Sequence, residues 1–219
     1  MTARALPFLF DLDGTLADTI GDIAASTNAV RRSYGLPAHD VATIQSFVGH
    51  GAGTLLRRAL AELELGDEDP RWAEARARYT AHHDRQCTVT ARLYPGVLPF
   101  LDALRARGHR LGVVTNKPER FARAVVAHLD LDRRVEIVIG GDTLAQKKPD
   151  PAPVLAALRR LGGDAGAGTM VGDGETDLRA GKAAGLRTIA CLFGYRPAAL
   201  LRAEGADEYW TRFGGDAAP

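Results

Sequence analysis

The chain has 219 residues, of which 46% are hydrophobic, 25% charged and 6% aromatic, and its formal net charge is +1. This length can bury one core and carry a smaller second unit, and the near-neutral charge argues against a nucleic-acid-binding protein. No apolar stretch approaches the roughly 20 residues of a membrane helix, acidic residues follow the N-terminus too soon for a secretory signal, and two cysteines make no disulfide framework. We therefore expect a soluble, cytoplasmic protein.

Short apolar runs alternate with segments of helical spacing along most of the chain. A strand that is buried on both faces reads as a continuous run of Val, Ile and Leu. Such runs occupy Pro7–Asp11, Leu111–Asn116, Val135–Gly141, Thr169–Asp173 and Thr188–Leu192. Helical spacing is found over 96–107, 119–129, 153–161 and 176–184. The alternation predicts an α/β fold, with a parallel sheet covered by helices on both sides.

One long segment interrupts this alternation. From about Asp18 to Arg92 the pattern is helical, with no convincing strand. Turn and cap signals divide it into four helices that begin near 20, 41, 52 and 70, where Asp40 is the expected cap of the second. We therefore predict two domains. They are an α/β core of residues 1–16 and 92–219 and a helical domain of residues 17–91.

Polar clusters follow four of the predicted strands. The carboxyl ends of parallel strands meet at one edge of a sheet, so we expect these clusters to form one ligand site. The clusters are Asp11-Leu12-Asp13-Gly14-Thr15, Thr115-Asn116-Lys117, Lys147-Lys148-Pro149 and Gly172-Asp173 with Asp177.

This set of side chains suits phosphoryl transfer. Crowded carboxylates need a cation, and oxygen ligands without His or Cys favour Mg²⁺. A carboxylate such as Asp11 can attack phosphorus, and Asp13, about 6.6 Å further along an extended strand, points the same way. Lys148 and the Thr115 hydroxyl can neutralise phosphoryl oxygens.

The four clusters resemble the motifs of the haloacid dehalogenase superfamily of phosphatases. DLDGT at 11–15 is similar to the first motif, Thr115 to the second, Lys148-Pro149 to the third and Gly172-Asp173 with Asp177 to the fourth. The resemblance spans the chain and implies a Rossmann-like core with a small helical (C1-type) cap inserted after the first strand. Lys148 is preferred over Lys147 because the family's lysine directly precedes the proline.

The resemblance also implies a role for each motif residue. Asp11 is the nucleophile, and Asp13 is the acid that protonates the leaving alcohol and then the base for water. Thr115 and Lys148 hold the phosphoryl group, while Asn116 either contacts it or supports the Asp11 loop. The implied Mg²⁺ site consists of Asp11, Asp13 through its backbone carbonyl, Asp173 and Asp177.

Within the superfamily, the helical segment resembles the cap of phosphoglycolate phosphatases. The similar stretches are DTIGDIAASTNAVRRSYGLP at 18–37 and FVGHGAGTLLRRAL at 47–60. The implied substrate is a small phosphorylated metabolite, 2-phosphoglycolate first. His50 and Arg57 are candidate substrate-binding residues of the cap, because a cationic side chain there could receive a small carboxylate.

Other interpretations stay open at this point. A sugar-phosphate phosphatase or phosphomutase of the same superfamily would reuse Asp11 and Asp13. A receiver-type phospho-switch, from a different functional class, would also phosphorylate an aspartate. No partner other than the small metabolite is expected, neither nucleic acid nor membrane, and the sequence leaves the oligomeric state open.

Overall fold

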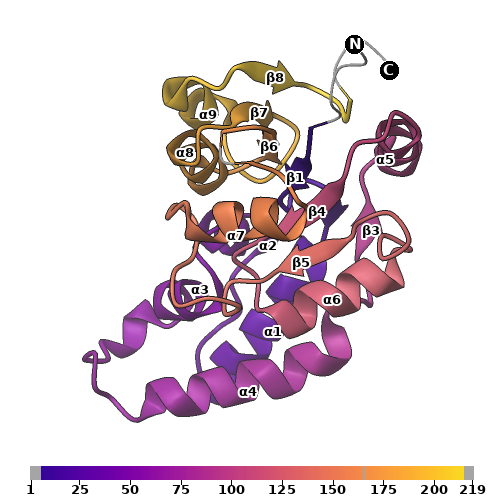
Figure 1. Ribbon diagram of the computed structural model, residues 1–219. Helices are drawn as coiled ribbons and strands as arrows, with labels where there is room; N and C mark the ends of the chain where they lie inside the picture. The colour runs from indigo at the N-terminus through magenta and orange to yellow at the C-terminus, as the bar shows by residue number, and fades with distance from the viewer. Residues whose placement is uncertain (1–5, 165, 215–219) are drawn as a thin grey trace.

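A central parallel sheet organises the larger part of the fold. The computed structural model describes residues 6–164 and 166–214. The sheet consists of β1 (Phe8–Phe10), β4 (Leu111–Val114), β5 (Ile137–Ile139), β6 (Thr169–Gly172), β7 (Arg187–Cys191) and β8 (Glu208–Trp210). These strands lie in the order β5-β4-β1-β6-β7-β8, and each neighbouring pair is parallel (Figure 1). The five predicted strands are confirmed, and β1 lies inside the sheet.

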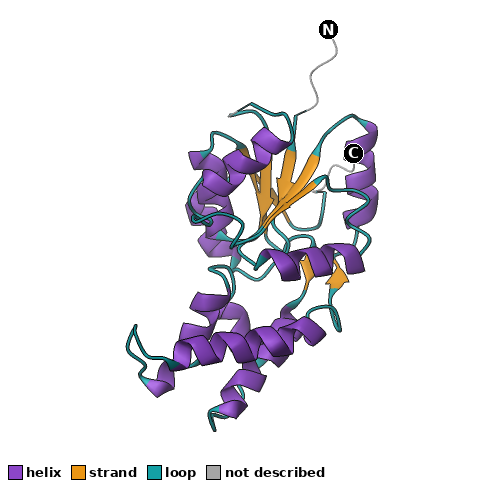
Figure 2. Ribbon diagram, turned by 60° about the horizontal axis from the view of Figure 1, so that its bottom comes forward, coloured by secondary structure: helices purple, strands orange, loops and turns teal. Residues whose placement is uncertain are grey.

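Helices cover both faces of this sheet (Figure 2). They are α5 (Val97–Ala106), α6 (Glu119–His128), α7 (Ala152–Arg160), α8 (Glu175–Ala183) and α9 (Ala198–Glu204). Successive strand residues point to opposite faces. Phe10 therefore packs with α5 and α6, whereas Leu9 packs with α7 and α8. Within the described ranges, no helix is long and apolar enough to cross a membrane.

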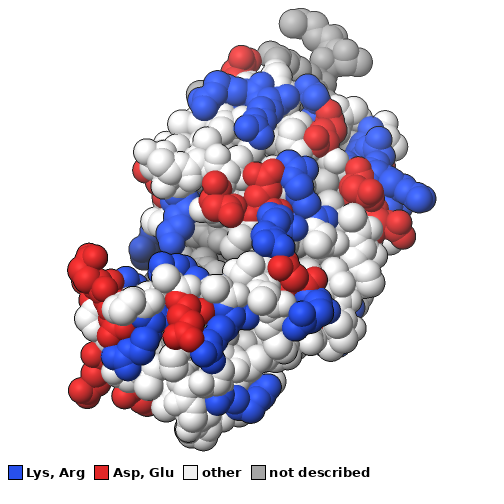
Figure 3. All heavy atoms as spheres, turned by 90° about the horizontal axis from the view of Figure 1, so that it is seen from below, with Lys and Arg blue, Asp and Glu red and all other residues white. Residues whose placement is uncertain are grey.

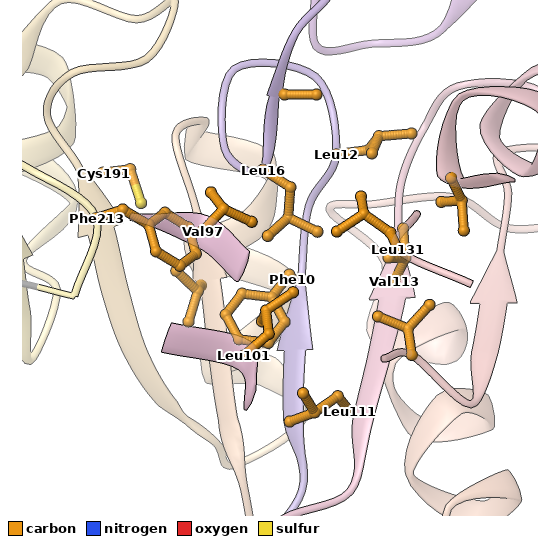
Figure 4. Close-up of a cluster of buried hydrophobic side chains, with 14 of the residues drawn as sticks. Phe10, Leu12, Leu16, Val97, Leu101, Leu111, Val113, Leu131, Cys191 and Phe213 are labelled. Carbon is orange, nitrogen blue, oxygen red and sulfur yellow. The ribbon is translucent and has the colours of Figure 1, made fainter. Parts of the chain in front are cut away.

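The apolar cluster under α5 and α6 fixes the position of β1 (Figure 4). Phe10, Leu101 and Val113 are fully buried in it. The ring of Phe213, which follows β8, stacks on Phe10 with 6.1 Å between centroids. Burying one such side chain stabilises the fold by about 1.5–3 kcal/mol. The strand that carries Asp11 is thus anchored by elements from both ends of the chain.

A second group of helices lies between β2 (Ala17–Asp18) and β3 (Arg92–Leu93). It consists of α1 (Ile20–Ser33), α2 (Val41–Phe47), α3 (Ala52–Ala59), a 3₁₀ helix (Ala61–Leu63) and α4 (Arg71–Gln86). These helices bury their own apolar cluster, which includes Leu56 and Trp72 and which Phe121 of α6 joins. β2 and β3 form an antiparallel ribbon through which the chain leaves and re-enters the α/β part. The division into two domains at residues 17 and 91 stays a prediction.

Some local features differ from the sequence expectations. Helical spacing predicts the third helix over Ala52–Leu63, but α3 ends at Ala59 and a 3₁₀ turn (Ala61–Leu63) follows it. The buried Arg31 of α1 donates to the Ala59 carbonyl and pairs with Glu62 at 2.8 Å, so another helix fixes this end. The two-residue strands β2 and β3, the helix α9 and the strand β8 were not predicted from the sequence. The two-residue strands are too short to show periodicity, and α9 begins without a side-chain cap such as Asp40 provides for α2.

Candidate active site

The four polar clusters converge at the carboxyl ends of β1, β4, β5 and β6. Asp11, Asp173 and Asp177 each offer a carboxylate oxygen, and these atoms lie within 4.8 Å of one another. Lys148 Nζ donates to Asp11 Oδ1 at 2.9 Å and to Asp177 Oδ1 at 2.6 Å. The structure thus brings three carboxylates and one ammonium group together, as the sequence predicted.

Lys148 is held from several sides. Its side chain is only 2% exposed, and Nζ also donates to the Val114 carbonyl. Asn116 Nδ2 donates to the Lys148 carbonyl at 2.8 Å, so the loop after β4 positions the loop after β5. Lys147 is exposed and donates to the His50 carbonyl at 2.8 Å instead. Of the two adjacent lysines, the structure places Lys148 with the carboxylates.

The Asp173 carboxylate lies directly against the backbone of Gly14. Gly14 has a φ of +89°, and a Cβ there would lie 2.2 Å from Asp173 Oδ2. Only glycine fits both this left-handed conformation and this contact. The Thr15 hydroxyl donates to Asp173 Oδ1 at 2.9 Å, and the Tyr195 backbone N–H donates to Oδ2 at 2.8 Å. Loops after β1 and β7 therefore fix this carboxylate.

The grouped carboxylates are short of compensating positive charge. Burial, followed by the charges of Asp11 and Asp177, raises the pKa of Asp173 well above its usual range. Burial and Asp11 raise the pKa of Asp177 to about 7, although Lys148 acts in the opposite direction. Burial alone would lower the pKa of Lys148, but Asp11 and Asp177 outweigh it and raise that pKa. A donor set of buried carboxylate oxygens that lacks positive charge fits Mg²⁺.

Asp13 lies apart from this group of carboxylates. Its Oδ1 accepts from the Thr19 hydroxyl at 2.5 Å and from Lys117 Nζ at 3.0 Å. The side chains of Lys117 and Asp13 are only 4% and 10% exposed. No role was predicted for Lys117 or Thr19 from the sequence. The signal for Lys117 was its place two residues after Thr115, at the same strand end.

Asp11 and Asp13 line a pocket of about 620 Å³, a volume that includes the space at its mouth. The buried Thr115 and Asn116 belong to its wall on the α/β side. The helical group contributes Ile23, Val48, Gly49, Gly51, Ala52, Leu55 and Tyr79. Figure 3 shows Lys and Arg side chains beside a hollow in one face of the molecule, with acidic side chains interspersed. The pocket thus lies between the sheet edge and the helical group.

Side chains from three core loops hold the segment 46–50 of the helical group. The donors follow β4, β5 and β7, and every acceptor is a backbone carbonyl. The bonds are Asn116 Nδ2 to Gly49 O (2.9 Å), Lys147 Nζ to His50 O (2.8 Å) and Arg196 Nη1 to Ser46 O (2.9 Å). This segment of the helical group is therefore fixed over the pocket.

His50 is not itself among the described residues that line the pocket, and it lies beside Arg196, which was not predicted as a site residue. Gly49 and Gly51, which flank His50, line the pocket, as does Arg196. Arg196 Nη2 lies 3.5 Å from His50 Nδ1 and donates to Glu175 Oε1 at 3.1 Å. Arg196 follows the last predicted strand in a loop, and no motif marked it.

Arg57 is not brought to the pocket. Its guanidinium pairs with Asp67 at 2.8 Å and lies 4.7 Å from the centroid of the Trp72 ring. The expectation that Arg57 contacts substrate therefore has no support in this geometry. Arg57 follows the buried Leu55 and Leu56 on α3, and the helix turns it to the exposed side.

Comparisons with known proteins give a matching family model, similar relatives and a similar solved structure. A family model described as haloacid dehalogenase-like hydrolase matches residues 8–191. The chain is 45% identical over 201 residues to a phosphoglycolate phosphatase of Rhodospirillum rubrum, covering 89% of this chain and 83% of the relative. It is 40% identical over 188 residues to one of Xanthomonas campestris, covering 86% and 83%. A crystal structure from Haemophilus somnus, described as a predicted phosphoglycolate phosphatase, has a TM-score of 0.88 at 27% identity and covers 97% of this chain and 96% of its own.

Proposed function

The chain belongs to the haloacid dehalogenase-like hydrolase family, and from this premise we propose that it is a Mg²⁺-dependent phosphomonoesterase acting on 2-phosphoglycolate. The family and the relatives indicate a phosphatase with a small phosphorylated substrate. One observation carries the proposal furthest. Lys148 Nζ lies 2.9 Å from Asp11 and 2.6 Å from Asp177, inside a group of three carboxylates at the end of the pocket.

In the proposed first step, Asp11 attacks phosphorus while the bond from phosphorus to the leaving oxygen breaks. Lys148 and the Thr115 hydroxyl bind the phosphoryl oxygens. Asp13 gives its proton to the leaving oxygen, which departs as the alcohol. This step leaves an aspartyl-phosphate at Asp11.

In the second step, Asp13 takes a proton from a water molecule that attacks the phosphorus of the aspartyl-phosphate. The bond from phosphorus to Asp11 breaks, which releases phosphate and restores the carboxylate. Thr19 and Lys117 keep the Asp13 carboxylate in place, because both donate to its Oδ1.

Asp11, Asp173 and the Asp13 backbone carbonyl would hold Mg²⁺, with Asp177 beside them. When bound, the ion supplies positive charge that neutralises phosphoryl oxygens in the transition state. The raised pKa values of Asp173 and Asp177 support this assignment, because at both carboxylates burial and the charge of Asp11 favour the protonated form, at Asp177 even against the effect of Lys148.

We further propose that residues 17–91 form a cap domain over a core of residues 1–16 and 92–219. Such a cap would exclude water and select the leaving group. The names of the relatives support glycolate as that group. We propose that His50 contributes to its binding from the pocket edge and that the enzyme works in the cytoplasm.

The family match and the names of the relatives favour hydrolysis over a receiver-type phospho-switch and over a phosphomutase. A receiver-type phospho-switch would keep its phosphate on Asp11 for hours and would not turn over. A phosphomutase would convert a sugar phosphate into its isomer and would release little phosphate. Measuring the release of phosphate over many turnovers therefore tests both alternatives.

Asp11→Asn tests the nucleophile. The variant should fold normally but lose about 10³-fold or more of kcat on 2-phosphoglycolate and on p-nitrophenyl phosphate. Asp102→Asn is a matched control, because this exposed carboxylate pairs with Arg134 on the surface of the core. Removing Mg²⁺ with a chelator should abolish turnover, and Ca²⁺ should restore it poorly, since its looser coordination misaligns the reacting groups. Wild-type turnover by Asp11→Asn would show that the nucleophile is wrong.

A further inference from the structure

The pocket has two cationic side chains among its described lining residues, Lys117 and Arg196. We propose that Arg196 binds a carboxylate on the leaving group, so that the enzyme selects phosphomonoesters of hydroxy acids over those of neutral alcohols. The inference rests on the proposed function and adds the residue that selects the substrate.

The ammonium group of Lys117 is already paired with Asp13, the proposed acid and base. Its ammonium lies 3.0 Å and 3.2 Å from the two carboxylate oxygens of Asp13. Lys148 is likewise occupied by Asp11 and Asp177, and Arg57 lies outside the pocket. Arg196 also pairs with a carboxylate, Glu175, but its guanidinium has further N–H donors for a second anionic group on the substrate.

The position of Arg196 suits this role because its guanidinium is fixed before a ligand arrives. The side chain is only 12% exposed. Its Nη1 donates to the Ser46 carbonyl of the helical group, and its Nη2 donates to Glu175 Oε1 of α8. A guanidinium carries five N–H donors in a planar fork, so further donors remain for a carboxylate. A preorganised fork loses little entropy when it binds.

The charged groups near Arg196 and His50 also favour the binding of an anion. Burial lowers the pKa of His50, and the cations Arg58, Arg196 and Lys147 lower it further, against the opposite effect of Glu175. His50 therefore stays neutral at pH 7. Besides Arg196, two cations (Arg58 and Lys147) and one carboxylate (Glu175) act on the same imidazole.

The test compares two phosphomonoesters of equal chain length. 2-Phosphoglycolate ends in a carboxylate, whereas 2-hydroxyethyl phosphate ends in a neutral hydroxymethyl group. In Arg196→Gln, kcat/KM for 2-phosphoglycolate should fall about 10- to 100-fold, the loss expected for a charge-assisted hydrogen bond. The value for 2-hydroxyethyl phosphate should change less than about 3-fold, because that substrate offers no carboxylate to pair. Arg202→Gln, an exposed arginine of α9 over the Tyr209 ring, is the matched control.

Equal losses on both substrates would overturn the inference, because Arg196 would then only fasten the helical group to the core. No loss on either substrate would also overturn it. In both cases wild-type hydrolysis of 2-phosphoglycolate would leave the proposed function standing, whereas a wild type inactive on both substrates would refute that function itself. If Arg196→Gln does not fold, Arg196→Lys takes its place. That variant keeps the charge but loses the fork, and a selective loss on 2-phosphoglycolate is again required.

Discussion

Replacing Lys117 with methionine removes a buried ammonium and nearly preserves the length of the side chain. The ammonium lies 3.0 Å from Asp13 Oδ1, and the two side chains are 4% and 10% exposed. In the variant, the Asp13 carboxylate keeps the Thr19 hydroxyl as its donor. Removing one partner of a buried ion pair costs about 3–5 kcal/mol, and the partial exposure of Asp13 favours the lower end. For a chain of this length, a loss of about 3 kcal/mol lowers the thermal midpoint by about 6–12 °C.

The assay is a double-mutant cycle of Lys117→Met and Asp13→Asn, followed by thermal unfolding with a chelator present. The double variant removes both charges, so its free energy of unfolding should exceed the additive expectation by about 1–3 kcal/mol. Lys182→Met, at an exposed position of α8, is the matched control and should shift stability by less than about 0.5 kcal/mol. Additive effects, or a Lys117→Met variant as stable as wild type, would refute the reasoning.

Two further variants test the carboxylate group. Without divalent cations, stability should fall as pH rises from about 4 to 7, because folded Asp177 holds its proton up to about 7 whereas the unfolded chain loses it near 3.8. In Asp177→Asn, the free energy of unfolding should fall less steeply with pH than in the wild type. Equal slopes in the two proteins would show that Asp177 does not titrate in this range. Gly14→Ala should cost at least about 1 kcal/mol at its positive φ and also lower kcat/KM, because the new Cβ meets Asp173. An unchanged melting midpoint and rate would show that the loop accommodates it.

The sheet and the grouped carboxylates could be predicted because each depends on a local pattern. Leu9 and Phe10 are both apolar, since helices cover both faces of β1. The strand ends then assign Asp11 and Asp173 to one edge, because parallel strands share their carboxyl edge. The order of apolar runs and polar clusters along the sequence was therefore sufficient to predict the sheet and the grouped carboxylates.

The partners of individual charged side chains could not be predicted in the same way. The run Thr115-Asn116-Lys117 places an ammonium at the site, but loop conformation decides that it faces Asp13 rather than Asp11. The helical period places Arg57 on α3 without showing which side of the helix faces the pocket. Arg196 lies in a loop with no periodicity, so its contact with the Ser46 carbonyl required the structure.

The attachment of segment 46–50 to the core has a consequence for how selectivity can change. Its three carbonyl acceptors belong to the main chain, which every amino acid supplies equally. Replacing Val48, which lines the pocket within the same segment, would therefore leave those anchoring acceptors in place while altering what a ligand meets. Evolutionary selection for a new leaving group could therefore change segment 46–50 without changing the hydrogen bonds that attach it to the core.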